Sequence, residues 1–379
     1  MPGMRVSLVD PSASTPPYDH LLAVALARAG AEVELLTSRF VYGPVPEADG
    51  YTLLEHFYRR SSAAGAGSRR RFILKGAAHV PDMISVRSRL RAADVAHWQW
   101  LALPPVDRLL LGPRPGGKPR VLTVHHPLPL GRSALRRQRR LQSAFDAVIT
   151  HTEEGARRIR TELGIEPGRV HTIPHGPLDY LTRLPVERPL PAELATVTGP
   201  VILFFGLLRE YKGVDTLLEA FAQVDREAEL WIAGMPRMPI EPLLELAARA
   251  PGTVRFLPRF IPDPEIPALL RRADILALPY REIEQSGVLH MGLAFGKPMV
   301  LSDVGGFTEV GARGAARLVG PGDVNALARE LSSLVSDPGQ RAGLAAAAER
   351  AVQGEFGWDA IAARTLQLYA DLGAGVGVD

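Results

Sequence analysis

Short apolar segments alternate with amphipathic segments along most of this chain, and no other feature restricts its fold as strongly. Arg5–Val9 is typical of a buried strand, and the helix expected over Asp19–Ala29 ends at Gly30. The same order returns later, where the apolar run Val201–Phe205 precedes a helical periodicity that starts at Val214. Strands that alternate with helices favour parallel sheets joined by right-handed crossovers.

The length of the chain predicts two domains. It has 379 residues, of which 46% are hydrophobic, so it can build two sizeable cores. Pro185–Pro200 is rich in proline and lacks periodicity, as expected of a linker. We therefore predict an α/β fold of two Rossmann-like, doubly wound domains facing across a cleft, with ligands beyond the carboxyl ends of the strands. The further strands that we expect are Glu32–Leu36, Val95–His97, Arg120–His125, Ala147–His151, Val170–Ile173, Glu229–Ala233, Thr253–Leu257, Asp274–Leu278, Met299–Ser302 and Arg317–Leu318.

The composition excludes several classes of function. The chain contains no cysteine, which rules out disulfides, thiolate metal sites and a cysteine nucleophile, and fits a reducing compartment. Its formal net charge of +3 is small and does not imply a nucleic-acid partner. The start, MPGMRVSLVD, lacks the basic head and long apolar run of a secretion signal, and no apolar run has the length of a membrane helix. We therefore expect a cytoplasmic protein.

Two segments are strongly basic. Arg59–Arg71 is small, polar and basic and is expected to form a flexible loop, whereas Arg132–Arg140 is expected to form a basic helix surface. A solvated face is the simpler interpretation of both segments. The alternative is a patch that meets an anionic acceptor or, at the inner face of the membrane, an anionic lipid surface.

A strand, a glycine turn and two cations precede the helix that starts at Val214. Gly206 follows the strand directly and would let the backbone approach a ligand, and Arg209 and Lys212 supply positive charge. A helix N-terminus adds unpaired N–H groups and a partial positive charge. This segment therefore indicates a site for a phosphorylated ligand, with an ordinary surface strand–turn–helix as the alternative.

A second helix start follows a later strand. Ser286 is a suitable N-cap for a helix that begins at Gly287 and Val288. Glu282 and Glu284 precede it in a polar loop, where they either are solvated or accept hydrogen bonds from sugar or ribose hydroxyls. If the two helices follow neighbouring strands, their N–H groups converge on one anion, which suits a nucleotide-linked sugar.

Several segments together resemble the retaining GT-B glycosyltransferases of family 4, with a group 1 glycosyltransferase domain in the C-terminal half. The segments that carry this resemblance are FFGLLREYKG, ADILALPY, SGV with LAFGKPMVLSDVGGFTEV, VLTVHHPLP, DAVITHTEEGARRI, VHTIPHGP and FGWDAIAARTLQLY. The resemblance covers nearly the whole chain. It implies an acceptor-side domain over residues 1–190, a nucleotide-sugar donor domain over residues 199–355, and a final helix over residues 356–379 that crosses back to the first domain.

The resemblance also implies roles for particular residues. The cation pair that neutralises the leaving diphosphate corresponds to Arg209 and Lys212, although Arg209 lies two positions after the family's usual arginine. His125 matches a histidine that sits near the transferring sugar. The turn Ser286–Val288 resembles a variant of the family's Glu-x7-Glu motif, and Met291 stands where the second glutamate is expected.

The activity implied by this resemblance is transfer of a sugar from a nucleotide-sugar donor to a hydroxyl of a glycan, lipid or small-molecule acceptor, with retention of the anomeric configuration. We expect no cofactor and no metal, because the sequence has no Asp-x-Asp pair and the cations and helix N-termini can stabilise the leaving diphosphate. The alternatives are a sugar-nucleotide epimerase or phosphorylase on the same fold, and a non-catalytic nucleotide-sugar-binding paralogue.

Overall fold

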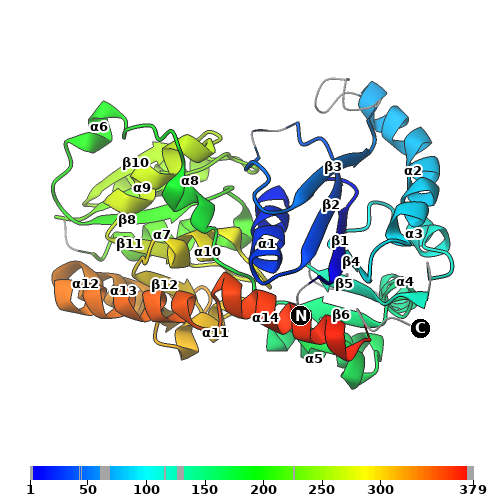
Figure 1. Ribbon diagram of the computed structural model, residues 1–379. Helices are drawn as coiled ribbons and strands as arrows, with labels where there is room; N and C mark the ends of the chain where they lie inside the picture. The colour runs from blue at the N-terminus through cyan, green and yellow to red at the C-terminus, as the bar shows by residue number, and fades with distance from the viewer. Residues whose placement is uncertain are drawn as a thin grey trace. The chain divides into compact units, whose positions relative to one another are not determined.

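The chain divides into two compact units. The computed structural model describes residues 3–41, 43, 45–59, 69–114, 117–125, 132–224 and 227–373. Internal contacts group Met1–Gly176 with Trp358–Asp379 as the first unit and Pro177–Gly357 as the second unit. Both units are parallel α/β sheets covered by helices (Figure 1). The first unit is therefore built from two separate stretches of chain.

The sheet of the first unit has seven strands in the order β3-β2-β1-β4-β5-β6-β7, and its pairs are parallel. The strands are β1 (Arg5–Asp10), β2 (Glu32–Ser38), β3 (Thr52–Phe57), β4 (Val95–Trp98), β5 (Arg120–Val124), β6 (Ala147–Thr150) and β7 (Val170–Thr172). The interior strand β1 pairs with β2 on one side and β4 on the other, so the strand order reverses at β1. Its apolar side chains are buried because helices cover both faces.

The helices of the first unit are α1 (Pro16–Arg28), α2 (Arg69–Leu90), α3 (Pro104–Leu110), α4 (Arg132–Gln142), α5 (Glu153–Leu163) and α14 (Trp358–Asp371). Helix α14 packs against α1 although more than 300 residues of sequence separate them, and its Tyr369 is fully buried. The Tyr369 hydroxyl lies 2.5 Å from His97 Nδ1 on β4. Helices α2, α3 and α4 are successive neighbours on one flank of the unit (Figure 1).

The sheet of the second unit has six parallel strands in the order β10-β9-β8-β11-β12-β13. They are β8 (Val201–Phe205), β9 (Glu229–Ala233), β10 (Thr253–Leu257), β11 (Ile275–Leu278), β12 (Met299–Ser302) and β13 (Arg317–Val319). The helices are α6 (Ala192–Ala195), α7 (Val214–Phe221), α8 (Glu241–Arg249), α9 (Ile266–Arg272), α10 (Gly287–Ala294), α11 (Gly306–Ala312), α12 (Val324–Ser336) and α13 (Pro338–Gln353). Strands β8 and β11 are neighbours, so the helices that follow them, α7 and α10, begin at the same edge of the sheet.

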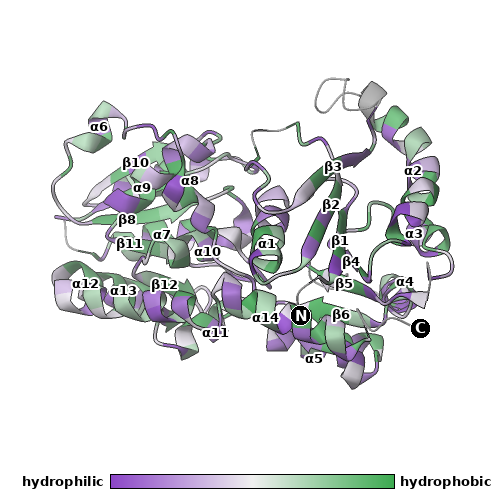
Figure 2. Cartoon of the chain, in the orientation of Figure 1, coloured by the Kyte–Doolittle hydropathy of each residue, from purple (hydrophilic) through white to green (hydrophobic). Residues whose placement is uncertain are grey.

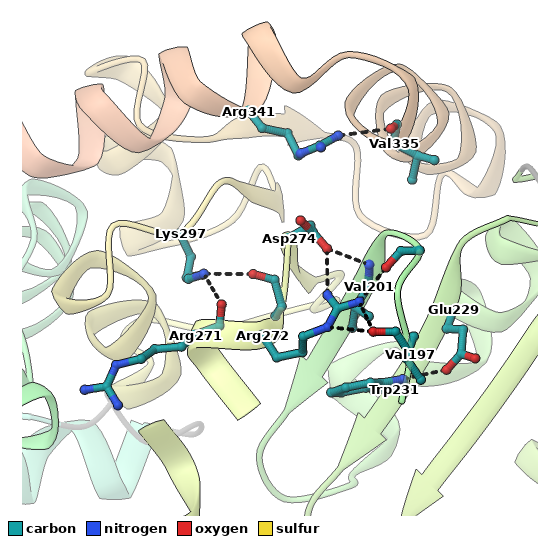
Figure 3. A network of polar contacts seen from close by, with 12 residues as sticks. Val197, Val201, Glu229, Trp231, Arg271, Arg272, Asp274, Lys297, Val335 and Arg341 are labelled. Carbon is teal, nitrogen blue, oxygen red and sulfur yellow. Dashed lines mark hydrogen bonds and ion pairs between the residues drawn. The ribbon is translucent and has the colours of Figure 1, made fainter. Parts of the chain in front are cut away.

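A polar network at the start of β8 and the end of α9 fixes the entry into the second sheet (Figure 3). Arg272 donates to the carbonyl of Val197 at 2.9 Å and forms an ion pair with Asp274 at 3.1 Å. Asp274 also accepts the backbone N–H of Val201. Lys297 donates to the Ala273 carbonyl at 2.8 Å, so this lysine of the Gly-Lys-Pro segment satisfies a carbonyl at the end of α9.

The strands expected from the sequence are confirmed, with ends that differ by at most two residues. Strand β3 and helix α3 were not expected. Residues 69–71 belong to helix α2, so the loop expected over Arg59–Arg71 is wrong there, and residues 60–68 lie outside the described residues. The basic helix expected at Arg132–Arg140 is confirmed as α4.

The expected linker Pro185–Pro200 contains the short helix α6, and the second unit starts before it, at Pro177. The sequence-based domain boundaries stay predictions. Within the part of the chain that the structure describes, no helix combines the length and apolarity needed to span a membrane.

Candidate functional site

A pocket of about 360 Å³ opens at the carboxyl ends of β8 and β11 in the second unit. This edge of a parallel sheet is where ligands of such folds bind. The pocket is lined by Phe205, Gly206, Leu207, Tyr211, Lys212, Gly234, Met235, Phe260, Ile261, Asp263, Ile266, Tyr280, Ile283, Gln285, Ser286, Gly287, Val288 and Met291. The lining is mostly apolar and aromatic, with a few polar groups, as is typical of small-molecule sites.

Glycines let the backbone close around this pocket. Gly206 has a φ of +118°, and a Cβ there would lie 3.0 Å from Lys212 Nζ and 3.2 Å from Val288 Cγ2. Gly234, which directly follows β9, has a φ of +152°, and a Cβ on it would meet the Gly206 carbonyl oxygen at 1.8 Å. Larger residues at these positions would therefore push the strand ends apart or fill the pocket.

Lys212 is a buried cation that pairs with no carboxylate of the described residues. Its side chain is almost fully buried, and its Nζ lies 4.8 Å from the centre of the Tyr280 ring. Among the described residues, its ammonium group makes no ion pair. Burial, helped by the positive charge of Arg209, lowers the pKa of Lys212 from 10.5 to about 8. A bound anion would supply the counter-charge that this ammonium group lacks.

The N-terminus of α10 borders the same pocket. The helix starts at Gly287 with Ser286 as its N-cap, but the Ser286 side chain makes no capping hydrogen bond. The first N–H groups of α10 are therefore open to a ligand in this pocket, with the positive end of the helix dipole behind them. Helix α7 contributes through Lys212, which directly precedes its N-cap, Gly213. Gly213 and Val214 at the start of α7 are not among the lining residues, so the expected convergence of N–H groups from both helices is not met. The pocket receives the N-terminus of α10 and, on the α7 side, the Lys212 ammonium group.

Five of the donor-side residues selected from the sequence line the pocket together, namely Gly206, Lys212, Ser286, Gly287 and Val288. The other three, Arg209, Glu282 and Glu284, do not line it. Arg209 and Glu282 are exposed, and Glu284 is half-buried.

The sequence reasoning missed several lining residues. Asp263 is the one carboxylate among the described lining residues, and it accepts a hydrogen bond from the Tyr180 hydroxyl at 2.8 Å. Phe260 and Asp263 come from the segment after β10, two strands away from β8, and no motif marks them. Met291, whose position was singled out for the missing glutamate, does line the pocket.

His125 belongs to the first unit and directly follows β5. Its Nδ1 lies 3.1 Å from His151 Nε2, and its Nε2 lies 3.1 Å from Gln99 Oε1. Its ring stacks on Trp100 with 5.0 Å between centroids and meets the edge of Tyr18 at 4.9 Å.

The hydrogen bonds of His151 place a hydrogen on His125 Nδ1. His151 is fully buried, which lowers its pKa to about 4 and keeps the ring neutral. Because His151 Nδ1 donates to the carbonyl of Ile173, its Nε2 is the acceptor for the His125 Nδ1 hydrogen.

Solved structures show which fold the chain has. A sucrose-phosphate synthase from Thermosynechococcus elongatus superimposes with a TM-score of 0.74 at 20% identity, over 98% of this chain and 99% of that chain. The Anabaena protein HepE, solved in complex with UDP-glucose, superimposes with a TM-score of 0.68 at 18% identity, over 97% and 100%. These likenesses show a GT-B fold, which consists of two Rossmann-like domains.

The sequence comparisons then give the family. The family model described as Glycosyltransferase Family 4 matches residues 20–176, and the model described as Glycosyl transferases group 1 matches residues 199–337. An alpha-maltose-1-phosphate synthase of Mycolicibacterium smegmatis is 30% identical over 68% of this chain and 74% of its own length. The chain therefore belongs to the GT-B glycosyltransferases. It spans between 57% and 74% of the length of the first curated relatives that it matches.

Proposed function

We propose that this protein transfers a hexosyl group from a nucleoside-diphosphate sugar to an acceptor hydroxyl, with retention of configuration and without a metal ion. The observation that carries the proposal is the buried ammonium group of Lys212, which faces a pocket bordered by the open N-terminus of α10 and has no carboxylate partner among the described residues. The neighbour HepE holds UDP-glucose, which supports a donor of this chemical class.

In the proposed reaction, the bond between the anomeric carbon and the diphosphate oxygen breaks while the acceptor oxygen bonds to the same face of the sugar. The departing diphosphate gains negative charge, which Lys212 and the α10 N–H groups stabilise. The acceptor proton passes to the departing phosphate oxygen. Fixed positive charge from the protein takes the place of a metal ion in this scheme, and exposed Arg209 adds a charge that acts on Lys212.

On the acceptor side, we assign His125 to contact a hydroxyl of the transferring sugar. It lies at the carboxyl end of β5, and its Nε2 can accept or donate a hydrogen bond. As part of the same proposal, the enzyme works in the cytoplasm, at the inner face of the membrane when its acceptor is a lipid. The chain contains no cysteine, which suits a reducing compartment.

A non-catalytic nucleotide-sugar-binding protein is the second candidate. Met291 lines the pocket where a glutamate was expected, and Glu282 and Glu284 do not line it. A pocket without these carboxylates can still bind a diphosphate through Lys212, because the anion contacts do not depend on them.

Donor hydrolysis by the purified protein separates these candidates. We expect slow release of sugar and nucleoside diphosphate from one of several donors, including UDP-glucose and GDP-mannose, and a loss on the order of a hundredfold in the Lys212→Met variant. The matched control is Arg350→Gln, which removes one exposed charge elsewhere in the second unit. Calorimetric binding of a donor without any turnover would favour the second candidate, and unchanged hydrolysis in Lys212→Met would exclude the assigned role of the lysine.

A further inference from the structure

Helix α2 carries apolar residues on two faces. One face packs into the core of the first unit through Met83, Val86 and Leu90, which recur at helical spacing. A second face, about a third of a turn around the helix, carries Ile73, Ala77, Val80 and Ile84 at spacings of four, three and four residues, and all four are exposed. Ile73 is 61% exposed and Ile84 is 53% exposed.

Further exposed apolar side chains lie outside this stripe. Phe72, beside Ile73 at the start of the helix, is 80% exposed. On the neighbouring helix α3, Val106 and Leu109 are exposed as well, and Leu109 is 73% exposed. Figure 2 shows hydrophobic residues interspersed with hydrophilic ones along both helices. Large apolar side chains gathered over two adjacent helices are typical of an interaction surface rather than of scattered surface residues.

A cationic groove lies between α4 and α3, the helix that carries Val106 and Leu109. It has a volume of about 360 Å³ and is lined by Arg108, Arg137 and Arg140, together with Pro104, Pro105, Ala134, Gln138 and Leu141. The lining contains no carboxylate among the described residues. None of the three arginine side chains forms an ion pair or hydrogen bond with another described residue, so their donors are open to anionic ligands.

The charges of the three helices reinforce this groove. Helix α4 carries five arginines and no acidic residue. The acidic residues of α2 and α3 are Asp82 and Asp107, and both bind inside the unit: Asp82 accepts the Tyr58 N–H at 2.8 Å, and Asp107 lies 2.5 Å from His79 Nε2. The outward charge of this flank is therefore positive.

We propose that this flank, formed by α2, α3 and α4, docks the first unit on an anionic lipid membrane. Apolar side chains of α2 and α3 enter the boundary between headgroups and acyl chains, and the arginines of the groove bind lipid phosphates in bidentate fashion. A soluble phosphorylated ligand would use the groove but would leave the apolar stripe without a partner. A nucleic acid would likewise have no use for exposed Ile73 and Ile84.

This inference deepens the proposed location of the enzyme, and lipid binding is measured apart from donor binding so that either can fail alone. The full chain is sedimented with vesicles of phosphatidylcholine alone or mixed with phosphatidylglycerol. We expect binding to the mixed vesicles that weakens as salt is added. The triple variant Arg108→Gln, Arg137→Gln, Arg140→Gln should bind mixed vesicles weaker by on the order of a hundredfold, because each arginine contributes about a fivefold factor near such a surface.

The double variant Ile73→Ser, Ile84→Ser should bind the mixed vesicles roughly tenfold more weakly at every salt concentration, because the interaction that it removes is hydrophobic and not electrostatic. The matched controls lie in the second unit: Arg249→Gln, Arg329→Gln, Arg350→Gln for charge, and Val186→Ser, Leu244→Ser for exposed apolar area. Circular dichroism melting checks that each variant is folded.

The proposal is overturned if the wild-type chain sediments with neither vesicle type, or if the control variants lose binding as strongly as the variants of the flank. It is also overturned if the chain is a dimer that ignores vesicles and becomes monomeric in Ile73→Ser with Ile84→Ser, because the flank would then join two copies. Calorimetric UDP binding that persists in a variant defective for vesicles shows that the donor pocket is intact.

Discussion

At the scale of single residues, Lys212 determines how the protein should respond to pH. Its folded pKa of about 8 lies below the ordinary 10.5, because burial penalises the charged form. A bound diphosphate stabilises the charged form and raises this pKa. We therefore expect UDP affinity to fall as the pH rises above about 8, with a limiting slope of roughly tenfold per pH unit. Calorimetric titration between about pH 7 and about pH 9 measures this slope.

The same pKa has the opposite consequence for the free protein. A lysine whose pKa is lower in the folded than in the unfolded protein destabilises the fold at every pH at which the unfolded lysine is protonated. The contribution of Lys212 to the free energy of unfolding therefore becomes more unfavourable as the pH falls from about 10.5 through about 8. The Lys212→Met variant removes both effects. Equal pH slopes for UDP binding in the variant and in the wild type would mean that another group carries the response.

At the scale of elements, the position of α10 depends on one small residue on its inner face. A Cβ at Gly292 would lie 2.7 Å from Leu276 Cδ2 and 2.7 Å from Met299 Sδ, on strands β11 and β12. Gly292→Ala should push α10 away from the sheet, at a cost of about 1–3 kcal/mol in the free energy of unfolding. Because the N-terminus of α10 borders the pocket, UDP affinity should fall as well. Chemical denaturation and calorimetry measure the two effects.

The control for this helix is Gly343→Ala in α13. A Cβ at Gly343 meets nothing within 4 Å, so the substitution should stabilise the protein by up to about 1 kcal/mol through helix propensity alone. If Gly292→Ala also stabilised the protein and left UDP binding unchanged, close packing of α10 on the sheet would not be what positions its N-terminus.

Which elements could be predicted from the sequence depends on how much of each is buried. Strands such as β8 are buried on both faces and form continuous apolar runs, so their sequence alone marks them. The edge strand β3 is largely exposed, and its mixture of polar and apolar residues gives no such run. Helix α2 contains Pro81 and is apolar on two faces, so no single amphipathic period marks its start.

The residues of the candidate site also differ in whether the local sequence predicts them. Gly206 directly follows strand β8 and Ser286 directly precedes helix α10, so the local sequence places both residues. Phe260 and Asp263 reach the pocket from the segment after β10, at the sheet edge. Their part in the pocket depends on the order β10-β9-β8, and nothing in one sequence specifies the order of strands in a sheet.

At the scale of the whole molecule, the first unit depends on the last stretch of the chain. Helix α14 packs on α1, and its Ile361 and Tyr369 are fully buried there. Burial of His97, which lies against the Tyr369 hydroxyl, lowers its pKa to about 3. A chain that ends after Gly357 loses this helix and opens the core of the first unit. The second unit, Pro177–Gly357, keeps all of its own sequence.

We therefore expect the chain truncated after Gly357 to lose the cooperative unfolding of the first unit while it still binds UDP. Removal of several large buried side chains costs about 2–5 kcal/mol each, which is comparable with the whole stability of a domain. Calorimetric melting should show one transition fewer or one at much lower temperature, and UDP should still raise the melting temperature of the transition that is left.

The control Tyr369→Phe keeps the ring and removes only the contact with His97, so it should cost about 1 kcal/mol. If the truncated chain melted like the full chain, α14 would not be part of the first unit's core. If it lost UDP binding together with the first unit, the second unit would not hold its pocket independently.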